Sequence, residues 1–142
     1  AGAALRVLAP CPGFTPHRGA NDNSFVISIE YGARRFLFTG DAEREEESEL
    51  VSAHGEDLRA DYLKVGHHGS RTSTSEEFLS LVAPSIATLS CGVRNRFGHP
   101  HAPTVERLLA HGVSALRLDR SGSVIVTTDG RALSARAMRE PL

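Results

Sequence analysis

Two adjacent histidines, His67 and His68, stand between glycines in the segment LKVGHHGS (63–70). Imidazole nitrogens bind Zn²⁺ and similar ions, and they exchange protons near neutral pH. A carboxylate, Asp41, follows another apolar segment in FLFTGDAE (36–43). A carboxylate and an imidazole are suitable ligands for Zn²⁺ or Mn²⁺, and a carboxylate can bridge two ions in a hydrolytic site. These residue types therefore indicate metal-assisted hydrolysis.

Each of these residues also has a simpler interpretation. Asp41 could serve only as the N-cap of the acidic helix expected after it, because Asp is among the best N-cap residues. A histidine near a strand end is often a hydrogen-bonded structural residue. Adjacent side chains of an extended chain point to opposite faces, so His67 and His68 are expected to have different roles. One would bind metal, and the other would orient it or touch substrate.

A third group of polar residues lies in the segment RNRFGHPH (94–101). Its hydrogen-bond donors, which surround a phenylalanine, a glycine and a proline, are Arg94, Arg96, His99 and His101. Such a cluster is typical of a loop that binds anions beside an aromatic platform. A solvated loop of the same composition is the alternative, and the sequence leaves both open.

Three further residues are candidates for contacts with a substrate. Asn21 and Asn23 lie in GANDNSF (19–25), where Asn, Asp and Gly favour a turn, and turn chemistry alone explains them. Ser70 follows the histidine pair and its glycine. All three side chains can donate hydrogen bonds.

Alternating strands and helices must position these residues. The expected strands are 25–31, 34–40, 60–66, 85–92, 114–119 and 123–130, and the expected helices are 41–55, 74–84 and 102–112. Gly32 and Ala33 suit a hairpin loop between the first two strands, and the last two strands are expected to pair. The order ββαβαβαββ predicts an α/β fold in which helices cover a mixed sheet. Functional groups of such folds gather at strand ends, where Asp41 and the histidines are expected.

The bulk composition limits the possible function classes. The 142 residues are expected to form one domain. Sixteen basic and seventeen acidic side chains give a formal charge of -1, so affinity for nucleic acid must come from a local patch. The run EREEE (43–47) is expected to form a solvated helix face. Cys11 and Cys91 are too few for a disulfide framework and are expected to be free thiols.

The sequence carries no membrane signal. No apolar run approaches the roughly 20 residues that span a bilayer. The first residues, AGAALRVLAP, lack the basic start and long apolar core of a signal peptide. We therefore expect a soluble domain without a transmembrane segment.

Four segments together resemble a known family. They are NDNSFVISIEYGARRFLFTGDAE (21–43), LKVGHHGSRTSTSEEFL (63–79), NRFGHPH (95–101) and LRLDRSGSVIVTTDG (116–130). The chain is similar to the metallo-β-lactamase-like domain of bacterial competence proteins of the ComEC/Rec2 type. The resemblance implies the C-terminal half of an αββα sandwich hydrolase with two divalent metal ions, Zn or Mn. It also implies a phosphodiesterase or nuclease that acts on single- or double-stranded DNA during uptake.

The resemblance also implies roles for the quoted residues. Asp41 matches the aspartate that bridges the metals, and His67 is favoured over His68 as the last histidine ligand because it directly follows the strand and its glycine. The residues expected to stabilise charge on the phosphate are His68, Arg96, His99 and His101. The residues expected to contact substrate are Asn21, Asn23, Ser70 and Arg94.

One departure from the family bears on activity. The main metal motif, His-x-His/Asp-x-Asp-His, does not occur in this sequence, and a further histidine ligand is also missing. We therefore expect residues 1–142 to be a single partial domain without the His-rich half, with partial or no metal occupancy and no activity of its own. The resemblance implies a parent protein in the bacterial inner membrane.

A half-sandwich is expected to leave one sheet face bare, with Val26, Ile27, Leu37 and Val65 on it. The missing half-domain or a second copy of the chain would cover this face. Two alternatives to the nuclease stay open. One is a non-catalytic half-domain that binds DNA or a partner, and the other is a metallohydrolase for another ester, such as a phosphocholine ester.

Overall fold

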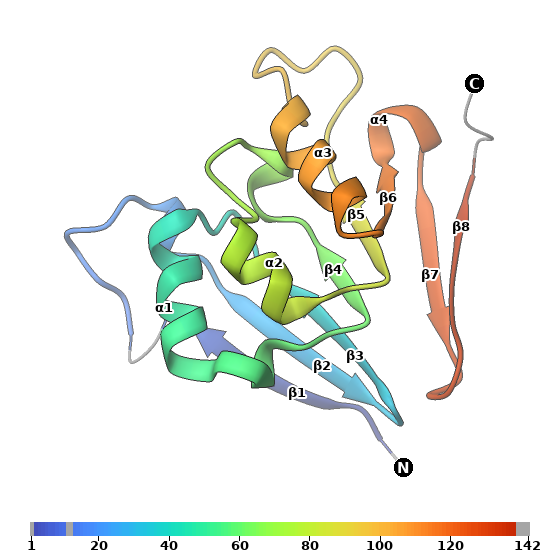
Figure 1. Cartoon of the computed structure of the whole chain (residues 1–142), viewed down its shortest axis with the longest axis horizontal. Coiled ribbons are helices and arrows are strands. Elements are labelled where there is room, and N and C mark those ends of the chain that lie inside the picture. The colour runs from blue at the N-terminus through green and yellow to red at the C-terminus, as the bar shows by residue number, and fades with distance from the viewer. Residues whose placement is uncertain (1, 11–12, 139–142) are drawn as a thin grey trace.

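The computed structural model describes residues 2–10 and 13–138 (Figure 1). A six-stranded sheet has the order β1 (Ala4–Ala9), β2 (Val26–Tyr31), β3 (Arg34–Phe38), β4 (Tyr62–Lys64), β5 (Ile86–Leu89) and β6 (Ser114–Arg117). A separate two-stranded sheet contains β7 (Val124–Thr128) and β8 (Leu133–Ala137). The helices are α1 (Arg44–His54), α2 (Glu76–Val82), α3 (Ala102–Ala110) and α4 (Leu118–Ser121), with short 3-10 helices η1 (Asn21–Asn23), η2 (Gly55–Leu58) and η3 (Gly66–Gly69).

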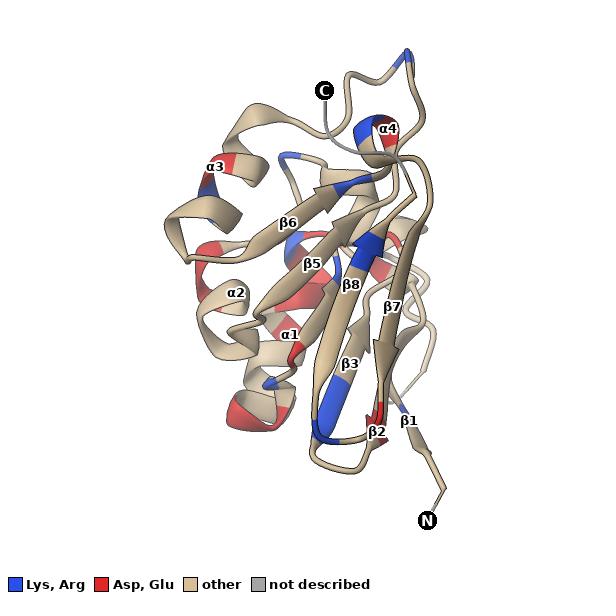
Figure 2. Ribbon diagram, turned by 90° about the vertical axis from the view of Figure 1, so that its right-hand side faces the viewer, with Lys and Arg blue, Asp and Glu red and all other residues tan. Residues whose placement is uncertain are grey.

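The predicted α/β class with a mixed sheet is confirmed. Strands β1, β2 and β3 are antiparallel neighbours, and β3 to β6 run parallel. Helices α1, α2 and α3 cover one face of the large sheet, and the β7–β8 hairpin lies on its other side (Figures 1 and 2). The free thiol expected at Cys91 is confirmed, whereas Cys11 lies outside the described residues.

Two parts of the fold differ from the sequence prediction. The sequence prediction did not include β1. Its apolar side chains Leu5 and Val7 are 61% and 55% exposed, so the apolar residues of this strand do not mark a buried face. The expected pairing of strands 114–119 and 123–130 is wrong. Strand β6 pairs with β5, and β7 pairs with β8, which lies in the segment expected to be a tail. The one-turn helix α4 separates β6 from β7 and lets the chain leave the large sheet.

The main core lies between the sheet and its helices. Leu37, Leu63 and Ala87 are aligned across three neighbouring strands and are fully or almost fully buried. Phe78 of α2 and Leu108 of α3 belong to the same apolar cluster. Burial of apolar surface here holds the strands in register, and the register fixes where each strand ends.

Of the four apolar residues expected on the other face of the sheet, the structure places only Ile27 there. Val26, Leu37 and Val65 are buried in the core, so the expectation that they form a bare face is wrong. The registers β1–β2–β3–β4 instead place Leu5, Val7, Ile27, Ile29, Phe36, Phe38 and Tyr62 on that side. Side chains alternate along a strand, so an error of one position exchanges the two faces.

The β7–β8 hairpin meets the large sheet at the β2–β3 turn. The backbone N–H of Ala33 donates to the carbonyl oxygen of Gly130 at 2.7 Å. A Cβ on Gly32 would lie 2.4 Å from that same oxygen, so only glycine permits the approach. In the part of the chain that the structure describes, no helix is long and apolar enough to cross a membrane.

Candidate functional site

The candidate site lies at the edge of the sheet where β3, β4 and β5 end (Figure 1). These strands run parallel, so their carboxyl ends meet at one edge. Asp41 follows β3, the histidine turn η3 follows β4, and the loop 90–101 follows β5. The sheet therefore brings together three segments that are far apart in the sequence.

Asp41 does not cap helix α1. The helix begins at Arg44, and a carboxylate oxygen of Asp22 accepts hydrogen bonds from the backbone N–H groups of Glu43 (3.0 Å) and Glu46 (3.1 Å). Asp22 is buried and supplies the negative charge that a helix start favours. The N-cap interpretation of Asp41 is therefore wrong, and its carboxylate is available to other groups.

The two histidines lie in a turn with left-handed backbone. Their φ angles are 42° for His67 and 56° for His68, so the segment is not extended. The expected alternation of the two side chains between opposite faces is therefore wrong. Both rings approach His99, with centroid distances of 5.3 Å from His67 and 6.2 Å from His68. The flanking glycine allows this turn, because a Cβ on Gly66 would lie 2.8 Å from the carbonyl oxygen of Ala42.

His68 is oriented toward Asp41. Its Nδ1 lies 2.6 Å from the carbonyl oxygen of Ser90, a distance at which Nδ1 carries the proton and donates. In the neutral ring, Nε2 then has the lone pair, and it lies 3.5 Å from Oδ1 of Asp41. A histidine fixed through one nitrogen by a carbonyl group is the usual arrangement of a metal ligand.

His67 is held by a different carboxylate. Its Nδ1 lies 2.6 Å from Oε1 of Glu43, and the side-chain amide of Asn21 lies 3.5 Å from the same nitrogen. The hydroxyl of Thr72 also donates to Oε1 of Glu43, at 2.6 Å. Burial raises the pKa of Glu43, but the hydrogen bonds from Thr72 and His67 outweigh it, and the pKa lies below its ordinary value. Glu43 is therefore an ionised anchor for His67, which sequence reasoning missed.

Lys64 is a second residue that sequence reasoning missed. It is the only lysine of the chain, and it lies at the end of β4. Its ammonium donates to the carbonyl oxygen of Gly40 and lies 3.8 Å from Oδ1 of Asp41. Burial lowers the pKa of Lys64, although Asp41 acts in the opposite direction. A polar residue between Leu63 and Val65 in an apolar strand was the available signal.

The loop 90–101 brings His99 into the site. The ring of His99 lies between the histidine turn, the ring of His101 at 4.9 Å and the ring of Phe97 at 5.9 Å, measured between centroids. Burial lowers the pKa of His99, and the neighbouring histidines lower it further. His99 is therefore a neutral ring packed among other rings at neutral pH.

The other predicted residues of this loop, His101, Arg96 and Arg94, differ in their contacts. Nδ1 of His101 accepts a hydrogen bond from the backbone N–H of Arg71 at 3.1 Å. The guanidinium of Arg96 lies over the ring of Phe97, 5.1 Å from its centroid. Arg94 makes no hydrogen bond or ion pair with the residues that the structure describes. Arg96 thus belongs to the aromatic group, and the structure gives Arg94 no defined partner there.

The three candidates for substrate contact besides Arg94 differ in what they do. Asn21 lies beside His67 and is part of the site. The side chain of Asn23 bonds to both backbone groups of Thr15, at 2.7 and 3.1 Å, so it stabilises the preceding loop. Ser70 is buried, and its hydroxyl lies 2.8 Å from that of Thr72.

Asp41 and His68 have the right chemistry for a divalent metal ion. One supplies a carboxylate oxygen and the other an imidazole nitrogen with a fixed tautomer, and both are ligands that Zn²⁺ and Mn²⁺ accept. Across residues 2–10 and 13–138, however, no three His, Cys, Asp or Glu side chains converge to hold a metal ion. The donors therefore fit part of a metal site.

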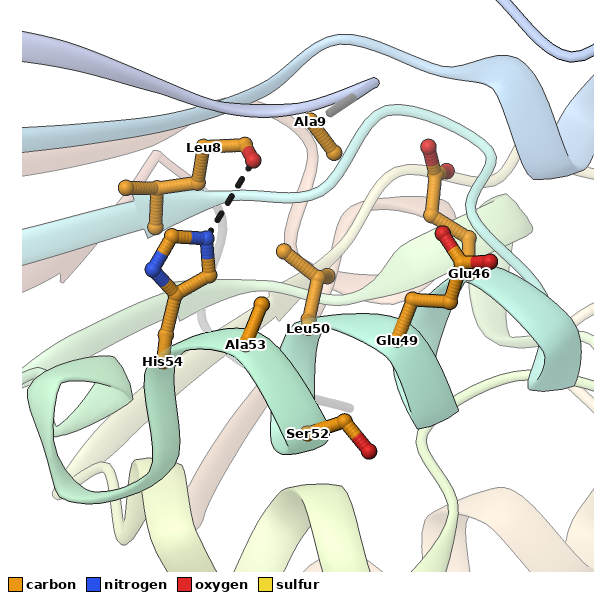
Figure 3. Close-up of a pocket in the computed structure, with 8 residues that line it drawn as sticks. All are labelled: Leu8, Ala9, Glu46, Glu49, Leu50, Ser52, Ala53 and His54. Atoms are coloured by element: carbon orange, nitrogen blue, oxygen red, sulfur yellow. Dashed lines mark hydrogen bonds between the residues drawn. The ribbon is translucent and has the colours of Figure 1, made fainter. Parts of the chain in front are cut away.

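A separate cavity of about 310 Å³ lies between β1 and α1, away from these residues (Figure 3). Leu8, Ala9, Leu50 and Ala53 line it together with two carboxylates at one end, Glu46 and Glu49. The Nε2 of His54 lies 3.3 Å from the carbonyl oxygen of Leu8 and closes the other end. None of the metal-site candidates of the sequence lies in this cavity.

Two glutamates of α1 are buried, so the expectation of a solvated EREEE face is wrong for them. Glu47 accepts the backbone N–H groups of Thr74 and Ser75 at the start of α2. Glu46 is 1% exposed and accepts the backbone N–H of Ser24, but its Oε1 has no partner among the described residues. Burial raises the pKa of Glu46 to about 7.

Comparison with known proteins finds relatives for most of the chain. Residues 4–93 match the family described as "Metallo-beta-lactamase superfamily". The chain is 40% identical to ComE operon protein 3 of Bacillus subtilis over 104 residues, which are 73% of this chain and 13% of that protein. It is 39% identical to competence protein ComA of Neisseria gonorrhoeae over 104 residues, 73% of this chain and 15% of that protein. It is 38% identical to recombination protein 2 of Haemophilus influenzae over 125 residues, 88% of this chain and 15% of that protein.

Proposed function

Because this chain belongs to the metallo-beta-lactamase superfamily, we propose that it forms part of a metal-dependent phosphodiesterase site that acts on DNA during uptake. The similarity to competence proteins of the ComEC/Rec2 type, expected from the sequence, is confirmed. The observation that carries the proposal is the approach of His68 to Asp41 at the carboxyl edge of the sheet.

We assign Asp41 and His68 as metal ligands. The sequence favoured His67 for this role. Nδ1 of each ring is held by an oxygen, from Glu43 for His67 and from Ser90 for His68, but it is Nε2 of His68 that lies 3.5 Å from Asp41. A bound Zn²⁺ or Mn²⁺ would supply Lewis-acid polarisation of a phosphoryl oxygen and a nucleophile at neutral pH. His67 and Glu43 would then position the turn or move a proton at the edge of the site.

Two ligands are fewer than a two-metal site needs. The chain spans about 13 to 15% of the length of the curated relatives named above. We propose that residues 1–142 are a partial domain whose remaining ligands come from another segment of such a longer protein. We also propose that this longer protein lies in the bacterial inner membrane.

Residues of the loop 90–101 would contact the phosphate. Arg96 and His101 lie around His99 and Phe97, next to the proposed metal ligands. Guanidinium and imidazole N–H groups donate charge-assisted hydrogen bonds to phosphate oxygens and stabilise the charge that develops on them. Loss of Arg96 should therefore weaken cleavage without removing metal.

One observation favours a second function, a half-domain that binds DNA or a partner without catalysis. The ammonium of Lys64 lies 3.8 Å from Oδ1 of Asp41. A lysine in this position neutralises the carboxylate in the absence of a metal ion, as a structural ion pair would. In that case Asp41 and His68 would stabilise the turn and would hold no ion.

A cleavage assay separates the two functions. Single- and double-stranded DNA are incubated with Mn²⁺ or Zn²⁺ and either this chain or the chain joined to the region that precedes the matching segment in ComE operon protein 3. We expect cleavage by the joined protein, its loss in Asp41→Asn, and none by the chain alone. A joined protein that binds both metals but cleaves neither DNA contradicts the nuclease and leaves the binding function.

A further inference from the structure

A small hollow lies beside the proposed metal ligands. Its volume is about 210 Å³, and it is lined by His68, Ser90, Cys91, Gly92, Asn95, Phe97 and His99. The residues belong to η3, which follows β4, and to the loop between β5 and α3, which projects at the top of Figure 1. Because His68 lines the hollow and also faces Asp41, a group bound there lies next to the candidate reaction centre.

Aromatic rings line this hollow in nearly parallel orientation. The planes of Phe97 and His99 differ by 25°, and those of His99 and His68 differ by 24°. Phe97 is 64% exposed although its side chain is apolar. The guanidinium of Arg96 lies over the ring of Phe97, 5.1 Å from its centroid, and adds a positive charge beside it. Exposed parallel rings with an adjacent guanidinium are a typical surface for stacking a planar group.

The loop that carries the rings is fixed by its own hydrogen bonds. The side-chain amide of Asn95 donates to the carbonyl oxygens of Gly92 (3.0 Å) and His99 (2.6 Å). Its oxygen accepts the backbone N–H of His99 at 2.9 Å. All of these contacts lie within the loop, so Asn95 has little capacity left to read the edge of a ligand. The hollow offers ring faces in a fixed position and few free polar groups.

We propose that this hollow is a stacking site for one unpaired nucleobase of a DNA strand whose neighbouring phosphate lies at Asp41 and His68. The volume is below that of a typical pocket for a drug-sized ligand and suits a single planar ring system. Recognition by ring faces accepts both purines and pyrimidines, because every base has a π-face. The position of the phosphate rests on the proposed function, whereas the stacking itself does not.

A stacking site of this kind binds one form of DNA in preference to another. A base that is stacked and paired within a duplex cannot enter the hollow unless it leaves the helix, which costs free energy. The site therefore selects single strands or frayed ends over intact duplex. Its contribution to affinity is insensitive to salt, since the base carries no charge, whereas phosphate contacts weaken as salt rises.

The test compares a single strand that has bases with one that lacks them. Binding of a fluorescein-labelled thymidine hexanucleotide and of its abasic analogue is measured by anisotropy, without added metal. Stacking of one base contributes about 1 to 3 kcal/mol, so we expect the abasic strand to bind roughly 5- to 150-fold more weakly. Phe97→Ala should remove this difference, and Phe97→Trp should keep it. Val93→Ala is the matched control, because Val93 lies in the same loop, is 66% exposed and does not line the hollow.

A second readout reports the stacking directly. A strand with 2-aminopurine in place of one base should lose fluorescence on binding to the wild type and to Val93→Ala, but not to Phe97→Ala. Equal affinity for the two strands, or no affinity for either, would overturn the stacking site. Metal-dependent cleavage of a base-free phosphodiester by the joined protein would leave the proposed function intact in either case. A base-dependent difference with no cleavage would support the stacking site and overturn the nuclease.

Discussion

Nε2 of His68 lies 3.5 Å from Oδ1 of Asp41, while the other nitrogen of the same ring is fixed by the carbonyl oxygen of Ser90. The two residues come from the ends of two neighbouring parallel strands, β3 and β4. Asp41 is free for this contact because Asp22 caps helix α1 in its place. The relationship therefore depends on three segments, and each can be tested by substitution.

Replacement of Lys64 tests whether its ammonium competes with a metal ion for Asp41. Lys64→Met removes a positive charge that lies 3.8 Å from the carboxylate, so we expect stronger Mn²⁺ and Zn²⁺ binding in calorimetric titrations. Lys64→Arg keeps the charge and should leave the affinity close to that of the wild type. If Lys64→Met binds metal more weakly than Lys64→Arg, the lysine supports the site and does not compete with it.

Replacement of Asp22 tests the origin of the helix cap. Asp22→Ala removes the acceptor of two backbone N–H groups, and the loss of such a cap costs about 0.5 to 2 kcal/mol of unfolding free energy. Asp22→Asn retains a cap acceptor and should lose less. Asp41→Ala is the informative comparison, because an unfolding free energy that falls more for Asp41→Ala than for Asp22→Ala would restore Asp41 as the cap.

Glu46 makes stability depend on pH. Its pKa is raised to about 7 in the folded protein from 4.5, so between these values the folded state binds more protons than the unfolded state. The free energy of unfolding should therefore fall as pH rises through this window, by at most about 3 kcal/mol. Glu46→Gln removes the buried charge, and urea unfolding should show it to be more stable than the wild type at pH 8 but not at pH 4.

The neighbouring exposed glutamate gives the control for this prediction. Glu45→Gln changes the same charge in the same helix turn, but Glu45 is exposed. It should leave the pH dependence of the unfolding free energy unchanged. If the unfolding free energy of the wild type does not change between pH 5 and 7, or if Glu45→Gln behaves like Glu46→Gln, the pKa of Glu46 is not raised in the folded protein.

The face opposite the helices is expected to mediate association. Leu5 lies in the edge strand β1 and is 61% exposed. Exposed apolar side chains on an edge strand promote pairing with other chains, so sedimentation velocity should show self-association that rises with concentration. Leu5→Lys should reduce it. Leu109→Lys, at a residue of α3 that is also 61% exposed, should not, and equal effects of the two variants would rule out a specific face.

Sequence reasoning succeeded where a local pattern determines the structure. The strand and glycine before the histidines, and the apolar strand before Asp41, were enough to place both groups at one sheet edge. It failed where the conformation depends on distant contacts. The rings of His67 and His68 are held by Glu43 and Ser90, and helix α1 is capped by Asp22; all three partners are far away in the chain.

The same limit explains the choice between the two histidines. Sequence position favoured His67 as the ligand, because it comes first after the strand. The two rings differ in their hydrogen-bond partners, which are Ser90 for His68 and Glu43 for His67. These partners lie 22 and 24 positions away in the sequence. No spacing within LKVGHHGS carries that information.

Nitrogen NMR of the histidine rings during titration with Zn²⁺ tests the central claim most directly, because it identifies which atom binds metal. We predict that Nε2 of His68 moves to the shift of a metal-bound nitrogen while its Nδ1 stays protonated, and that Asp41→Asn abolishes the change. His67 should keep its signal. A metal-bound shift at His67 with His68 unchanged, or saturation of Zn²⁺ binding without any change at His68, would contradict the assignment of Asp41 and His68 as the metal ligands.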